Sequence, residues 1–332
     1  MNHQLADVGP LPRYDPGDGY DEAFSAPDVA RPHYAASLEA LGAADLAELA
    51  AAIARDVADF GMSFRTAGGS QPFPIDPVPR IMPSDEWSLL ERGMAQRARA
   101  LNAFLADAYG ERRIVEAGVV PERVLDGAQM LEPDLVGVPL AGGVHAGVGG
   151  FDVVRDASGE IEVLEDNLRT PSGLAYVDAA RDIVGRRLPD PADRAPLRTL
   201  ELLGQTLRAA TLDPGEEPVI VLLSDGSSNS AYWEHRRLAR ALEVPLVTPR
   251  DVVQREGRVW ARDDAGDSFA VDVLYRRTDE DRLRGDDGVL TWLGELLLEP
   301  LRRGTVACVN AFGNGLADDK LVHAYVGEMV SF

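Results

Sequence analysis

The sequence contains one cysteine, one lysine and no long apolar run. A lone cysteine, Cys308, cannot form an internal disulfide, and its apolar neighbours (TVACVN) indicate a small buried side chain, so we expect a reducing compartment. No apolar stretch approaches the roughly 18 residues that a transmembrane helix needs, and no charged segment followed by an apolar segment opens the chain. We therefore expect a cytoplasmic protein that has no membrane partner.

Positive charge is also scarce. The chain has 33 lysines and arginines against 55 acids, a formal net charge of -22. Such a surface repels nucleic acid, so we expect no nucleic-acid partner. A hydrophobic content of 45% in 332 residues suits two domains with ordinary cores, and it gives no indication of the oligomeric state.

Residues 150–173, GFDVVRDASGEIEVLEDNLRTPSG, contain the most informative pattern in the chain. Two runs of alternating β-branched and aromatic residues, 151–155 and 161–165, flank the short polar step ASGE. This arrangement predicts an antiparallel β-hairpin with a four-residue loop.

Four polar side chains share one face of this predicted hairpin. In the expected register Asp152 lies opposite Glu165. The period of two then places Asn167 and Arg169 on the same face as Glu165, while residues 166 and 168 point the other way.

Opposed carboxylates at this distance, about 5 Å between their Cβ atoms, destabilise a sheet unless a positive group lies between them. Two carboxylates and an amide oxygen suit a hard divalent ion, and Mg²⁺ is usual where phosphates supply further ligands. We therefore predict a metal site at Asp152, Glu165 and Asn167, with Arg169 as a phosphate-binding residue. A solvated hairpin face without a ligand remains the alternative.

The same four residues resemble the metal and phosphate motif of the ATP-grasp ligases. The longer string VLEDNLRTPSG resembles the circularly permuted ATP-grasp proteins of type 2, which are relatives of glutathionylspermidine synthase. The strings FPIDPVPRIMPSDEW, NSAYWEHRRLAR, VDVLYRRTD and GLADDKLVHAYV add to this resemblance, which covers roughly residues 60–332.

The resemblance implies an α/β fold with α+β elements, circularly permuted, in which an ATP-grasp-like half with the antiparallel hairpin accompanies a Rossmann-like pre-ATP-grasp domain. The expected parts are a flexible N-terminal arm at 1–36, a metal- and phosphate-binding half at 37–188, a linker and helix at 189–214, a Rossmann-like substrate domain at 215–310, and the start of a truncated nucleotide-binding half at 311–332.

The residues themselves also predict the Rossmann-like part. The strings PVIVLLS, DGSSN, SAYWEHRRLARAL and PLVTP read as strand, loop, helix and strand, which indicates a parallel sheet. We expect two strands around residues 256–257 and a third at VDVLYRR to extend this sheet.

In parallel sheets, ligands bind beyond the carboxyl ends of the strands. We therefore predict that Ser227, Ser228, Asn229 and Arg276 bind substrate. Ordinary capping of the following helix is the alternative for the first three.

Apolar residues at helical spacing predict helices over residues 45–60, capped by Asp45, and over residues 84–110. A further helix is expected to begin after Ser172, which would cap it. The expected buried stripe of the long helix consists of Trp87, Leu90, Met94, Leu101, Phe104 and Leu105.

The resemblance implies an ADP-forming ligase that joins a small-molecule or peptide carboxylate to an amine through an acyl phosphate, with ATP and Mg²⁺ as cofactors. Arg169 would be catalytic and would bind the nucleotide together with Lys320, which belongs to the DDK string at the start of the nucleotide-binding half. Only 12 residues follow Lys320 in this sequence, so the chain is expected to lack the rest of that half. The rival hypothesis is a catalytically incomplete or non-enzymatic binding or assembly protein that keeps the fold.

We expect no ATP turnover by the 332-residue chain alone, because the nucleotide-binding half would be incomplete. Activity should appear when roughly 100 further residues or more are added after Phe332 or supplied by another chain. The assay is ADP release with a panel of amino acids, amines and short peptides. Robust turnover by the short chain would show that this expectation is wrong.

Overall fold

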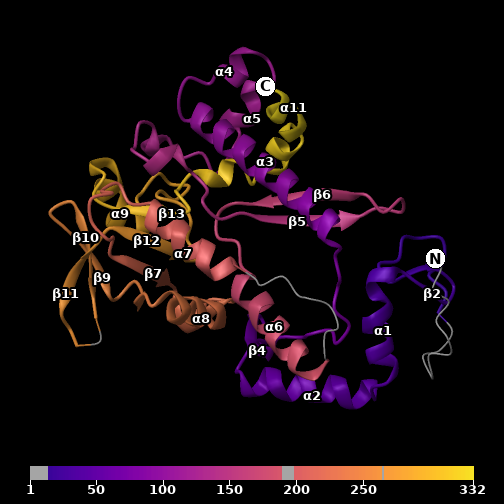
Figure 1. Ribbon diagram of the computed structural model, residues 1–332. Helices are drawn as coiled ribbons and strands as arrows, with labels where there is room; N and C mark the ends of the chain where they lie inside the picture. The colour runs from indigo at the N-terminus through magenta and orange to yellow at the C-terminus, as the bar shows by residue number, and fades with distance from the viewer. Residues whose placement is uncertain (1–13, 189–197, 264) are drawn as a thin grey trace. The chain divides into compact units, whose positions relative to one another are not determined.

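The protein is a mixed α/β chain, and its computed structural model describes residues 14–188, 198–263 and 265–332 (Figure 1). It divides into two compact units. The first comprises the described parts of residues 1–92, 153–164 and 173–197, and the second comprises those of 93–152, 165–172 and 198–332. Residues 189–197, within the predicted linker, lie outside the described residues. The predicted domain boundaries remain predictions.

The first unit and the elements that run from one unit into the other combine short strands with helices. The first unit contains β1 (Phe24–Ala26), β2 (Val29–Ala30), the 3-10 helix η1 (Pro32–Tyr34), α1 (Ala35–Gly42), α2 (Leu46–Asp59), β3 (Ser63–Thr66), β4 (Gly69–Pro72) and α6 (Leu174–Arg187). The elements that belong partly to each unit are α3 (Ser84–Ala108), β5 (Gly150–Arg155) and β6 (Ile161–Asn167).

The second unit holds most of the strands. Its elements are α4 (Arg113–Glu116), α5 (Glu122–Asp126), η2 (Pro133–Leu135), η3 (Ala141–Gly143), α7 (Thr199–Ala209), β7 (Ile220–Ser224), η4 (Gly226–Ser228), α8 (Tyr232–Leu242), β8 (Leu246–Val247), β9 (Val252–Arg255), β10 (Arg258–Arg262), β11 (Ser268–Val271), β12 (Val273–Arg277), α9 (Trp292–Arg303), β13 (Ala307–Val309), η5 (Asn314–Leu316), α10 (Lys320–His323) and α11 (Val326–Ser331).

Helices α2 and α6 pack together in the first unit. The predicted cap of α2 is confirmed, because the Asp45 carboxylate accepts hydrogen bonds from the backbone of Ala47 and Glu48. The buried residues of α2 recur at helical spacing, as an amphipathic helix requires. They are Leu49, Ala52, Ile53 and Val57.

The predicted cap of α6 is wrong. Gly173 is the N-cap residue, and Ser172 lies one position before it. The Ser172 hydroxyl instead accepts a hydrogen bond from Arg277 Nη2 at 2.6 Å. A charged donor outcompetes backbone amides for a hydroxyl acceptor, because hydrogen bonds from charged groups are stronger.

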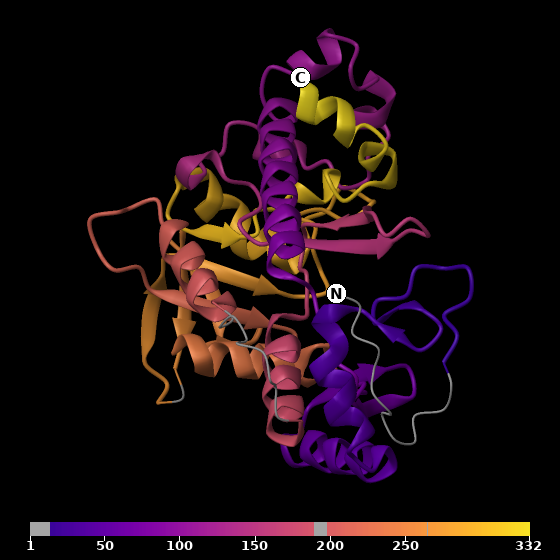
Figure 2. The same cartoon turned by 45° about the vertical axis from the view of Figure 1, so that its right-hand side comes forward.

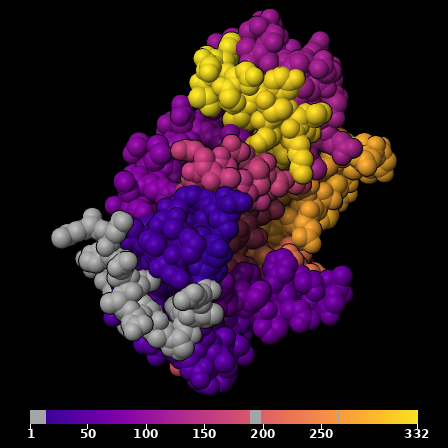
Figure 3. All heavy atoms as spheres, turned by 90° about the vertical axis from the view of Figure 1, so that its right-hand side faces the viewer, coloured from indigo at the N-terminus to yellow at the C-terminus, as the bar shows by residue number. Residues whose placement is uncertain are grey.

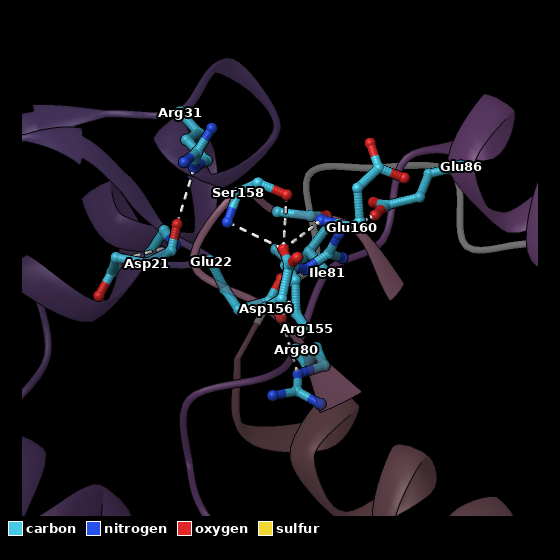
Figure 4. Close-up of polar contacts among 12 residues, drawn as sticks. Asp21, Glu22, Arg31, Arg80, Ile81, Glu86, Arg155, Asp156, Ser158 and Glu160 are labelled. Atoms are coloured by element: carbon cyan, nitrogen blue, oxygen red, sulfur yellow. Dashed lines mark hydrogen bonds and ion pairs between the residues drawn. The ribbon is translucent and has the colours of Figure 1, made fainter. Parts of the chain in front are cut away.

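Residues 14–36, predicted as part of a flexible arm, contain β1, β2 and η1. Their contacts converge on Arg155 at the end of β5 (Figure 4). The Arg155 guanidinium bonds Glu22 at 3.1 Å and also pairs with Glu86. The guanidinium groups of Arg155 and Arg31 lie 4.9 and 4.2 Å from the centre of the Tyr20 ring. Ion pairs and cation–π contacts therefore order a segment whose local pattern is weak.

The second unit contains a four-stranded parallel sheet in the order β13-β12-β7-β8. The predicted strand-loop-helix-strand unit is confirmed as β7, α8 and β8, and the strand at VDVLYRR is confirmed as β12. The expectation that the strands around residues 256–257 extend this sheet is wrong, because β9 and β10 join β11 in a separate antiparallel sheet. Positive φ angles at Glu256 (53°) and Gly257 (74°) close a tight hairpin, which favours local antiparallel pairing.

Different layers cover the two faces of the parallel sheet (Figure 2). Alternate residues such as Val221, Leu223 and Leu274 join α9 and the β9-β10-β11 sheet in one apolar core. Helices α7 and α8 contact β12, β7 and β8 and supply buried leucines of their own. The sheet is therefore buried on both sides, as is usual for parallel strands.

A second core in this unit joins the carboxyl-terminal part of α3 to the last helices of the chain, and Figure 3 shows the end of the chain (yellow) against this helical region. Leu101, Phe104 and Leu105 are buried here, as predicted. Trp87 is 54% exposed, so its predicted burial is wrong. The first turns of a long helix do not have to share the packing of its last turns. Among the described residues no helix combines the length and apolarity that crossing a membrane requires.

His235 is a buried titratable group of the second unit. Its Nδ1 lies 2.8 Å from the Ser224 hydroxyl. Burial and the nearby Arg277 charge lower the pKa of His235 from 6.5 to about 3. The imidazole therefore stays neutral in the folded chain at physiological pH.

Replacing His235 with glutamine should flatten the pH dependence of stability. Between about pH 3 and 6.5 the unfolded chain binds a proton at His235 and the folded chain does not, so the free energy of unfolding falls as the pH falls. In this window His235 is expected to contribute about 1.4 kcal/mol per pH unit to the change in the free energy of unfolding. Urea denaturation at several pH values would measure this slope. His33→Gln is the control, because His33 is less buried, and it should change the slope less. An unchanged slope in His235→Gln would contradict the assignment.

Candidate functional site

A cavity of about 460 Å³ in the second unit lies at the end of the β5–β6 hairpin. It is lined by Gly150, Asp152, Asn167, Arg169, Thr170, Pro171, Ser172, Asp279, Asp281 and Asp318. Three of the predicted site residues, Asp152, Asn167 and Arg169, therefore border one cavity.

The three predicted metal ligands do not all line this cavity. Asp152 is exposed, and its Oδ1 lies 3.4 Å from Asn167 Nδ2, at the long end of hydrogen-bond distances. Glu165 is half-buried on β6 and is not among the described lining residues. A carboxylate beside an amide matches part of a Mg²⁺ site, since this ion usually takes one or two carboxylates and completes its shell with phosphates and water.

Asp166, which alternation along β6 places on the face opposite Asn167, forms a buried ion pair with Arg97. Asp166 is 2% exposed, and its carboxylate accepts two hydrogen bonds from Arg97, at 2.5 and 2.7 Å. His323 Nδ1 lies 2.8 Å from the same carboxylate. Asp166 therefore ties β6 to α3 and α10, while Asn167 faces the cavity.

The backbone of Leu168 is held on both sides. Its N–H donates to Asp318, and its carbonyl accepts hydrogen bonds from the side-chain amides of Asn310 and Asn314. Asn310 also accepts from the backbone of residues 147 and 148. These bonds place the end of β6 against the segment that follows β13.

Arg169 is clamped between two aspartates. Its Nε donates to Asp318 at 2.8 Å, and its Nη1 donates to Asp281 at 2.7 Å. Burial by itself lowers the pKa of Arg169, but the bonds to Asp318 and Asp281 outweigh burial and raise it. A Cβ atom on Gly315 would lie 2.9 Å from Arg169 Cδ and 3.0 Å from Met130, so the packing of this side chain requires a glycine there.

Asp318 is the more buried partner of this clamp. Burial raises the pKa of Asp318, although Arg169 and the Leu168 N–H act in the opposite direction. Arg169 is 41% exposed, so solvent screens its half of the pair. The clamp therefore orients Arg169 at the cavity more than it stabilises the fold.

The loop that closes the cavity after β6 is fixed by Arg277. This buried side chain donates to the Pro171 carbonyl and to Ser172, each at 2.6 Å. Glu234, fully buried on α8, lies 3.3 Å from the same guanidinium and balances its charge.

The predicted substrate-binding loop after β7 reaches the cavity indirectly. Asn229 is buried, and its amide donates to Asp279 at 2.7 Å and to Asp225 at 3.2 Å. Asp279 lines the cavity, whereas Ser227 and Ser228 are exposed and are not among its described lining residues. Burial and the Asp225 charge raise the pKa of Asp279.

Arg276 is buried beneath the site. It is 1% exposed, and its guanidinium lies 4.6 Å from the centre of the Phe312 ring. The described lining of the cavity does not include Arg276, because alternation along β12 directs Arg277 to one face of the sheet and Arg276 to the other. Its role in substrate binding remains a prediction.

Lys320 is the first residue of α10 and is exposed. The described lining of the cavity contains Asp318 and not Lys320. The structure does not place Lys320 on the wall of this cavity, and its predicted nucleotide contact remains a prediction.

The cavity is strongly acidic. Its described lining holds four aspartates and one arginine, and two of the aspartates already pair with that arginine. No group of three or more His, Cys, Asp or Glu side chains among the described residues is arranged to hold a metal ion by itself. The arrangement therefore suits a cation that also takes ligands from a bound substrate.

Sequence reasoning missed Asp279, Asp281 and Asp318. Asp318 belongs to the DDK string, from which only Lys320 was predicted to bind a ligand. The other two belong to TDED, directly after β12, where the carboxyl-end rule for parallel sheets points. If that rule is applied to every carboxylate that follows a strand, it identifies both Asp279 and Asp281.

A known protein family matches the part of the chain that contains these cavity residues. Residues 79–332 match the family model described as circularly permuted ATP-grasp type 2. This range includes β5, β6 and every residue that lines the acidic cavity.

Similar proteins occur in several bacteria. An uncharacterized protein of Mycobacterium tuberculosis is 38% identical over 94% of this chain and 58% of its own length. An uncharacterized protein of Synechocystis is 37% identical over 97% of this chain and 69% of its own length. A putative glutamate–cysteine ligase of Frankia alni is 42% identical over 97% of this chain and 38% of its own length. The chain thus spans less than two thirds of the length of the Mycobacterium and Frankia relatives.

Asp166→Asn should destabilise the second unit. The substitution leaves Arg97 without its buried counter-charge, which is expected to lower the free energy of unfolding by about 3–5 kcal/mol. Urea denaturation would measure this loss. Glu201→Gln is the matched control, because Glu201 pairs with Arg198 at an exposed site and should change stability little. Equal effects of the two substitutions would refute the anchoring role of Asp166.

Proposed function

Because the chain belongs to the circularly permuted ATP-grasp type 2 family, we propose that it acts in an ATP-dependent ligase that joins a carboxylate to an amine. The observation that carries this proposal is the shared cavity of Asp152, Asn167 and Arg169. The name of the Frankia relative supports a ligase. The match covers only 38% of the length of that relative. We therefore take the reaction class from its name and not the two substrates.

In the proposed reaction an oxygen of the substrate carboxylate attacks the γ-phosphorus of ATP and ADP leaves. The amine then attacks the acyl carbon of the acyl phosphate and displaces inorganic phosphate. Bound Mg²⁺ would supply charge neutralisation at the β- and γ-phosphate oxygens. Asp152 and Asn167 would hold it, with Glu165 as the third ligand that the sequence predicts.

Arg169 would position the transferring phosphoryl group. Its two fixed bonds use Nε and Nη1, and its Nη2 makes no hydrogen bond to a described residue. A guanidinium held in this way can donate to a phosphate oxygen without reorganising. Asp281 and Asp318 would act as positioning residues, because their contact is with Arg169.

The surplus of carboxylates fits the second substrate as well. Asp279 makes no ion pair with a described residue, and its pKa is raised by burial and by Asp225. An ammonium group entering the cavity would relieve this repulsion. The acceptor amine would therefore bind on the Asp279 side, and the phosphates on the Arg169 side.

The test compares single substitutions that keep side-chain shape. Asp152→Asn and Glu165→Gln should each weaken Mg²⁺-dependent ATP binding at least about tenfold without lowering thermal stability. Thermal shift and calorimetry would measure binding, on the 332-residue chain and on the chain with any coding sequence that follows Phe332. Glu162→Gln, at an exposed position of β6, is the matched control.

The outcomes separate the hypotheses. Loss of binding in Asp152→Asn but not in Glu165→Gln would restrict the metal site to the cavity. Mg²⁺-independent binding that neither substitution changes would refute the metal assignment. No nucleotide binding by either length of chain would favour the non-enzymatic alternative.

A further inference from the structure

A second cavity, of about 320 Å³, lies elsewhere in the second unit. Its walls are the loop at residues 140–147, the end of α7 and the strand β13. The lining residues that matter below are His145, Thr206, Ala210, Cys308 and Asn310. No charged side chain is among its described lining residues, in contrast to the acidic cavity.

Strand β13 is an edge strand, and it pairs with β12 alone among the described strands. The Ala307 N–H donates to the Asp272 carbonyl, on the β12 side. Successive residues of a strand present their backbone groups to opposite edges, so the N–H and C=O of Cys308 point away from β12. That outer edge borders the cavity.

The backbone of Cys308 is buried without a described partner. Cys308 is 6% exposed, and no hydrogen bond joins its N–H or C=O to a described residue outside the sheet ladder. Buried backbone groups are almost always paired, because an unpaired one costs about as much as a lost hydrogen bond. A donor and an acceptor side by side in a cavity therefore indicate a partner that supplies both.

His145 adds a neutral hydrogen-bonding group to the same cavity. Its ring stacks on Tyr109 with 5.7 Å between centroids, and burial lowers its pKa to about 4. Neither ring nitrogen bonds a described residue. The other polar lining groups are already satisfied, because Thr206 donates to Leu202 and the Asn310 amide bonds the backbone of residues 147 and 148.

We propose that this cavity binds a small, neutral, planar molecule that carries a hydrogen-bond donor next to an acceptor, as a primary amide or lactam does. The donor would bond the Cys308 carbonyl and the acceptor the Cys308 N–H, as in the two-bond exchange that one residue makes with the residue opposite it across a strand edge. The volume lies in the range of small-ligand pockets. This site is separate from the proposed ligase chemistry and does not depend on it.

The experiment uses benzamide as the probe on the full 332-residue chain. Benzamide should shift the Cys308 amide resonance saturably in ¹H–¹⁵N spectra. Benzoate, which carries a charge, and N,N-dimethylbenzamide, which lacks the donor, should each bind at least about tenfold more weakly, because a buried polar group is left unpaired or a charge is desolvated.

Two substitutions test the location. Ala210→Leu fills the cavity and should abolish the shift, whereas Gln205→Leu, at an exposed position of the same helix, should leave it unchanged. His145→Phe keeps the stack on Tyr109 but removes the ring nitrogens, and it should weaken binding about three- to tenfold.

The proposal would be overturned by no saturable shift at Cys308, by benzoate binding as well as benzamide, or by Ala210→Leu binding as the parent does. Failure of all three probes to bind at millimolar concentration would show that the cavity holds water only, which would also overturn it.

Discussion

The backbone of Leu168 is the point on which the acidic cavity depends. Its N–H and C=O are both bonded by side chains from residues 310–318, about 150 positions further along the chain. Because Asn167 and Arg169 flank Leu168, this anchor sets the position of the end of β6. Asp166 adds a buried ion pair to Arg97, so neighbouring residues of one strand are fixed from several sides. A metal or phosphate site needs such fixed support, since small displacements of ligands cost affinity.

The same arrangement leaves the cavity with excess negative charge, which a cationic ligand would neutralise. Burial raises the pKa values of Asp318 and Asp279, and one arginine serves both Asp281 and Asp318. Unpaired carboxylates in a partly buried cavity repel each other and lose hydration. A divalent cation with its phosphates, or an ammonium group, removes both penalties. The proposed ligase chemistry brings both kinds of cation to this place.

The two cavities of the second unit illustrate two ways in which a parallel sheet offers binding groups. The acidic cavity receives Asp279 and Asp281 from the loop beyond the carboxyl end of β12, where side chains converge. The neutral cavity lies along the outer edge of β13, where the backbone itself presents a donor and an acceptor. In the two proposals, side chains would select a charged group at the first position, and backbone groups would select a ligand by its shape and hydrogen bonding at the second.

The sequence by itself determined the local elements: the Asp45 cap, the hairpin strands, the long helix and the parallel unit, because each depends on neighbours within a few residues. It also determined that Asp152, Asn167 and Arg169 belong together, through alternation and family resemblance. Tertiary structure alone decided that Asp281 and Asp318 clamp Arg169, that Trp87 is exposed and that β9 and β10 leave the parallel sheet. These features depend on groups far apart in the chain, and no local pattern encodes which distant charge will neutralise a buried one.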